Sequence, residues 1–76
     1  MKEPATVKDE ILNRVLESSS RQLEESAKNI EDIRSILHWA KSPRERTAIN
    51  TILDDQKKVA NALGRLVSHL SGMAGD

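Results

Sequence analysis

The chain has 76 residues, and its 12 basic and 12 acidic side chains give a formal net charge of zero at pH 7. A chain of this length forms one small domain, and its balanced charge removes the attraction to nucleic acids and anionic membranes that a basic surface provides. It contains no cysteine, which excludes disulfides and thiolate metal sites, and Trp39 is its only aromatic residue.

Neither a membrane span nor a signal peptide is expected. No apolar run approaches the roughly 20 residues that cross a bilayer, and residues 1–6 lack the apolar stretch of a signal peptide. These features favour a cytoplasmic protein, and signal-independent secretion is compatible with them as well.

The first predicted element is a long amphipathic helix over about residues 7–40, preceded by a flexible segment at residues 1–5. Apolar residues alternate three and four positions apart, as on one face of a helix. In heptad notation the a positions are Leu16, Leu23, Ile30 and Leu37, and the d positions are Leu12, Ser19, Ser26, Ile33 and Ala40. The two serines predict a narrow waist, where the helices pack closely, the register is fixed, or a hydrated groove receives a partner.

A turn is predicted at residues 41–43. Ser42 is a suitable N-cap, Pro43 fits the first helical position, and Glu45 completes a capping box. The second helix is therefore expected over about residues 43–71, with Gly72 and Gly75 beginning a flexible tail at residues 72–76. Gly64 lies inside this helix and is either a tolerated surface glycine or a point of close helix approach.

The second helix has its own apolar stripe, which is widened by Leu53, Ala60 and Val67. The stripe consists of Ile49, Ile52, Gln56, Val59, Leu63, Leu66 and Leu70. Two long helices joined by about three residues lie antiparallel, which sets residue i near residue 86 − i. The sequence thus predicts an all-α, coiled-coil-like two-helix hairpin in one domain, residues 6–71.

A hairpin alone leaves half of each stripe exposed, so we expect the two stripes to form the core and the seam of an oligomer. A second copy would complete a dimeric four-helix bundle.

Four apolar residues beside the main stripe of the first helix are predicted to bind a partner. They are Ile11 and Val15 at one end of the helix, and Ile36 and Trp39 at the other. Trp39 either serves in this way or folds over the turn and caps the hairpin.

The sequence predicts no catalytic residue, cofactor or metal site, because the motifs of phosphate loops, zinc hydrolases and nucleophile elbows are missing. The expected function is that of a non-enzymatic protein-interaction module, of the adaptor, co-chaperone or anti-activator type, which binds itself and another protein. The alternative is a Rop-like RNA-binding dimer. Scattered bases such as Arg46, Lys57 and Arg65, interrupted by Asp54 and Asp55, make nucleic-acid binding the weaker prediction.

Overall fold

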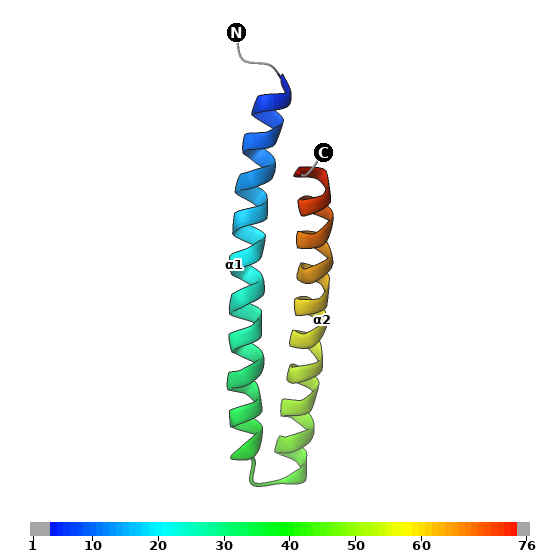
Figure 1. Cartoon of the computed structure of the whole chain (residues 1–76). Coiled ribbons are helices and arrows are strands. Elements are labelled where there is room, and N and C mark those ends of the chain that lie inside the picture. The colour runs from blue at the N-terminus through cyan, green and yellow to red at the C-terminus, as the bar shows by residue number, and fades with distance from the viewer. Residues whose placement is uncertain (1–3, 75–76) are drawn as a thin grey trace.

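The computed structural model describes residues 4–74, and the side chains of residues 7–73. It contains two helices, α1 (Pro4–His38) and α2 (Pro43–Ala74), which pack side by side in opposite directions (Figure 1). The predicted all-α helical hairpin is confirmed.

The first helix begins earlier than the sequence pattern indicated. Pro4 is its first residue, where the fixed φ of proline suits a helix and its missing N–H costs nothing, so residues 4–6, which the pattern placed before the helix, lie inside it. Residues 1–3 of the expected flexible segment lie outside the described residues. The end of α1 is tightened by two short bonds, from Trp39 N–H to Ile36 O (2.9 Å) and from Ala40 N–H to Leu37 O (3.1 Å).

The second helix starts where the sequence placed it. Ser42 Oγ accepts a hydrogen bond from the backbone N–H of Glu45 (3.1 Å), and Ser42 O accepts one from Arg46 N–H (3.0 Å). The predicted end at residue 71 is wrong, since α2 continues through Gly72 to Ala74. No described glycine has a positive φ, so Gly72 keeps the helical conformation and does not form a left-handed cap.

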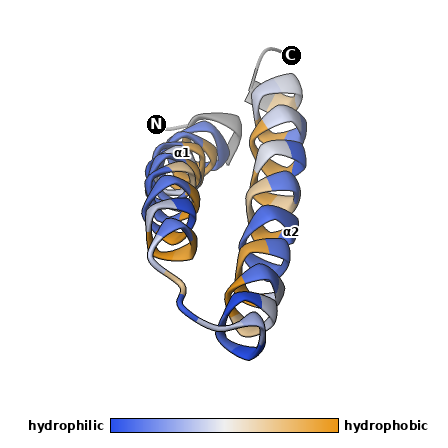
Figure 2. Cartoon of the chain, turned by 90° about the horizontal axis from the view of Figure 1, so that it is seen from below, coloured by the Kyte–Doolittle hydropathy of each residue, from blue (hydrophilic) through white to orange (hydrophobic). Residues whose placement is uncertain are grey.

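The core of the hairpin is a single thin seam between the facing sides of α1 and α2 (Figure 2). Its best-buried residues are Ser19 and Ser26, each 5% exposed, with Ile49 and Leu53 close behind. Small side chains let two helix backbones approach closely. The two serines are therefore less exposed than the leucines of the same seam. No described side chain is more than 98% buried.

One part of the predicted seam is wrong within the single chain. Leu53, Ala60 and Val67 are buried or half-buried in the seam, whereas Ile52, Val59 and Leu66 are exposed. Both rows satisfy the three-four alternation with Ile49, Gln56, Leu63 and Leu70, which do line the seam. The register with α1 decides between them, because residues 53, 60 and 67 lie opposite the d positions Ile33, Ser26 and Ser19. A role for the exposed row in an oligomer seam stays a prediction.

The hairpin is long and leaves much surface uncovered. Its principal dimensions are 64 × 14 × 13 Å and its radius of gyration is 17.7 Å, against about 11 Å for a compact domain of this length. Its accessible surface is 6123 Å², against roughly 4,650 Å² for a compact monomer of the same mass. Each chain therefore exposes about 1,500 Å² more than a compact fold would.

Candidate protein-interaction surface

Four apolar side chains form a line along the outside of α2, beside the seam. They are spaced seven residues apart, which keeps them on one side of the helix. We call them the outer row: Ile52, Val59, Leu66 and Met73, exposed by 54%, 49%, 41% and 51%.

Four exposed apolar side chains of α1 lie on the same side of the hairpin as the outer row. Val15 and Ile36 precede seam residues Leu16 and Leu37, so they occupy heptad position g, as the outer row does in α2. In an antiparallel pair of helices the g positions of both helices flank the seam on one side. Ile11 and Trp39 lie one turn from Val15 and Ile36 on this side. The outer row and these four residues, all exposed, are called the g face.

The opposite side of the hairpin, formed by the heptad e positions, is polar or small. It carries Asn13, Ser20, Ala27, Arg34, Asn50, Lys57, Gly64 and Ser71. A Cβ atom added at Gly64 would meet nothing within 4 Å, so the prediction of close helix approach at this residue is wrong within the chain. Gly64 is a tolerated surface glycine, and the hairpin has one apolar face and one polar face.

The predicted partner-binding residues are all exposed, but they do not form one patch. Trp39 is 78% exposed, so it does not fold over the turn as a cap. Ile11 lies where α1 extends beyond the end of α2 (Figure 1), since the register of the seam sets residue 12 opposite residue 74, where α2 ends. Along α1 the separation from Ile11 to Trp39 is about 42 Å, at a rise of about 1.5 Å per residue.

Between these two apolar ends, the g face of α1 is polar. The g positions there are Gln22 and Asn29, and Gln22 Nε2 donates a hydrogen bond to Ser18 Oγ (3.4 Å). Glu25 and Asp32 are exposed at the outer edge of the same stretch. The outer row of α2 runs alongside this polar stretch, so the g face is apolar along α2 and only at the two ends along α1.

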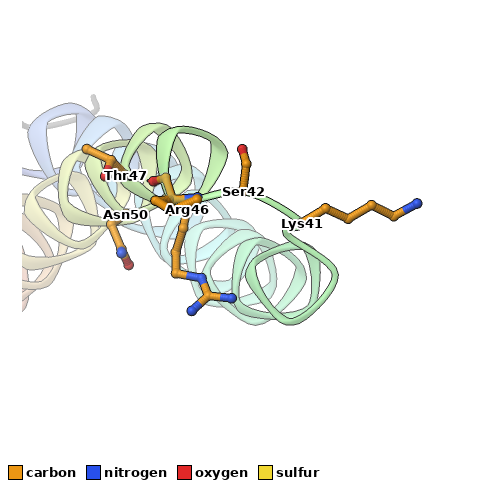
Figure 3. Close-up of a pocket in the computed structure, with 6 residues that line it drawn as sticks. Lys41, Ser42, Arg46, Thr47 and Asn50 are labelled. Atoms are coloured by element: carbon orange, nitrogen blue, oxygen red, sulfur yellow. Dashed lines mark hydrogen bonds between the residues drawn. The ribbon is translucent and has the colours of Figure 1, made fainter.

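A shallow hollow lies beside the turn that joins α1 and α2. The hollow of about 310 Å³ beside the turn (Figure 3) is lined by Lys41, Ser42, Pro43, Arg46, Thr47 and Asn50. Every one of these residues is exposed, and Lys41 points away from the others, so the hollow is a surface depression and encloses no ligand site. Within residues 4–74 no three His, Asp or Glu side chains gather as metal ligands would.

No helix in the described part of the chain is both long enough and apolar enough to cross a membrane. Comparisons with protein-family models, with curated proteins and with solved structures give no match. The function is therefore inferred from the chain's own residues.

Proposed function

We propose that this chain is a non-enzymatic protein-interaction module that self-associates through its g face and binds another protein by helix packing. The observation that supports this most directly is the outer row, four large apolar side chains that are exposed at seven-residue intervals along one side of α2. Apolar patches of this extent on a protein surface commonly mark sites of protein association.

The surface area supports a partner of substantial size. Each chain exposes about 1,500 Å² more than a compact monomer, so two chains that covered this excess would bury about 3,000 Å² in total. Interfaces of roughly 2,000 Å² and more are typical of permanent homodimers. A second hairpin laid along the g face is the simplest partner, and it would complete a four-helix bundle.

Trp39 and Ile36 are the proposed anchors for the other protein. Tryptophan is enriched among the residues that dominate binding energies, and Trp39 is 78% exposed beside Ile36, which is 54% exposed. An apolar helix face of a partner protein is the chemistry that suits them.

Affinity capture tests this binding with a matched pair of variants. Trp39→Ser/Ile36→Ser removes the anchors, whereas Asn13→Ser/Ala27→Ser changes two exposed positions on the opposite face. We expect a protein captured by the natural chain and by the control to be lost from the anchor variant. Undiminished capture by the anchor variant would contradict the proposal.

The same experiment can detect RNA binding. Capture of RNA that falls steeply with salt, and that depends on Lys57 and Lys58, would replace the proposed function by the RNA-binding alternative.

A further inference from the structure

We propose that two hairpins pair through their g faces with their turns at opposite ends, and that this pairing joins Trp39 and Ile36 of one copy to Ile11 and Val15 of the other. This inference rests on the self-association proposed above and specifies its geometry. The partner-binding surface would then be composed of residues from both copies and would be complete only in the dimer.

The outer row is matched to a reversed copy of itself. When α2 lies against an antiparallel second α2, Ile52 faces Met73 of the other copy and Val59 faces Leu66, because both pairs of residue numbers sum to 125. A two-fold axis near residue 62 therefore sets every member of the row against an apolar residue. Such self-complementarity is what a symmetric dimer interface requires.

The neighbouring positions on α2 fit the same axis. Ala62 lies beside Ala62 of the other copy at the centre, where a small side chain permits close contact. Asp55 lies opposite His69 of the other copy, because residues 55 and 69 sum to 124. Both residues are exposed in the single chain. On either side of the centre, the carboxylate of Asp55, a hydrogen-bond acceptor, would thus lie near the imidazole of His69, which can donate.

The first helix gives an independent match. In the same pairing Ile36 faces Val15 of the other copy, Trp39 faces Ile11, and the amide of Asn29 faces that of Gln22, with sums of 50 or 51. The centre of this pattern lies near residue 25 on α1 and that on α2 near residue 62, within about 3 Å of the same height along the hairpin. One two-fold axis therefore serves both helices.

The reverse arrangement, with both turns at the same end, matches less well. It sets α1 against α2 of the other copy, so that Gln22 faces Leu66 and Asn29 faces Val59. Amide groups would then be covered by apolar side chains that cannot hydrogen-bond with them. The proposed arrangement places Glu25 near Glu25 of the other copy. These two carboxylates lie at the outer edge of the interface, where water and salt screen their repulsion.

The overhang of α1 has a partner in this arrangement. The end that carries Ile11 extends past α2 of its own chain (Figure 1) and would lie against the turn of the other copy, beside Trp39. Both residues are uncovered in the single chain, and each would gain an apolar neighbour.

Trp39 fluorescence tests the pairing, since Trp39 is the only aromatic residue of the chain. At a concentration where sedimentation gives a dimer, we expect the emission to lie to the blue of that of an exposed tryptophan. Ile11→Asp should shift the emission to the red, although residue 11 lies about 42 Å from Trp39 of the same chain, at the other end of α1. The control is Asn13→Asp on the opposite face of the same end, which should leave the emission unchanged.

Crosslinking gives a second test that does not involve these residues. The chain has no cysteine, so Ala62→Cys introduces a single thiol at the proposed axis, and Ala27→Cys introduces one at similar height on the opposite face. A short bis-maleimide should link Ala62→Cys chains in pairs, and Ala27→Cys chains much less. This pairing would be overturned, with self-association intact, if the protein forms a dimer in which Ala62→Cys chains are not crosslinked and Ile11→Asp does not change the Trp39 emission. A chain that sediments as a monomer throughout would overturn both proposals.

Discussion

Replacing Ile52 and Leu66 by serine removes half of the outer row without touching the seam of the hairpin. In the single chain these side chains are 54% and 41% exposed, so about half of each remains to be buried by a partner. Full burial of such a side chain contributes about 1.5 to 3 kcal/mol, so the two residues together should contribute about 1.4 to 2.8 kcal/mol per chain. A symmetric dimer contains each of them twice, which makes about 3 to 6 kcal/mol.

The assay is sedimentation equilibrium of Ile52→Ser/Leu66→Ser over a wide range of concentration. The free energy above corresponds to a dissociation constant raised by about 10² to 10⁴ fold. Asn50→Ser/Lys57→Ser is the matched control, because it introduces serine at two exposed α2 positions on the polar face and thereby accounts for the lower helix propensity of serine. Equal dissociation constants for the variant and the control would refute the assignment of the interface to the outer row.

Three further substitutions test the fold. Gly64→Ala should stabilise the protein by about 1 kcal/mol in thermal or urea unfolding and leave association unchanged, because an added Cβ meets open space and alanine favours the helix; a loss of association would instead place an interface on the polar face. Ser42→Ala should destabilise it by about 1 kcal/mol through loss of the bond from Glu45 N–H to Ser42 Oγ, and an unchanged urea midpoint would contradict that role. Ser26→Leu should overpack the waist and cost about 1 to 3 kcal/mol, measured by urea unfolding; a stabilised variant would show that the waist has room.

Local sequence signals predicted most of the fold. The Ser42-Pro43 start of α2 depends only on capping chemistry between residues close in the chain. The seam of α1 follows one row of apolar residues, and other apolar residues lie beside that row only at its two ends. Both predictions agree with the structure. Glycine at position 72 gave a misleading signal, because a helix can continue through glycine at a modest free-energy cost when no left-handed cap forms.

The candidate surface was only partly predictable, because two apolar rows run along α2. Ile52, Val59 and Leu66 fit the helical repeat as well as Leu53, Ala60 and Val67 do, and only packing against α1 decides which row is inside. That choice also defines the g face, because the excluded row becomes the exposed one. Trp39 presents a similar ambiguity, since its position at the end of α1 is compatible with either a cap or an exposed anchor. Its 78% exposure excludes the cap, and its role as an anchor stays a proposal.

Sedimentation equilibrium of the natural chain, with circular dichroism at the same concentrations, measures directly whether two hairpins associate. We expect a mass of twice 8.5 kDa at high concentration. We also expect helicity to fall on dilution, as the dimer separates into hairpins whose seam contains no fully buried large side chain. A mass of 8.5 kDa at every concentration, with undiminished helicity, would contradict the proposed self-association.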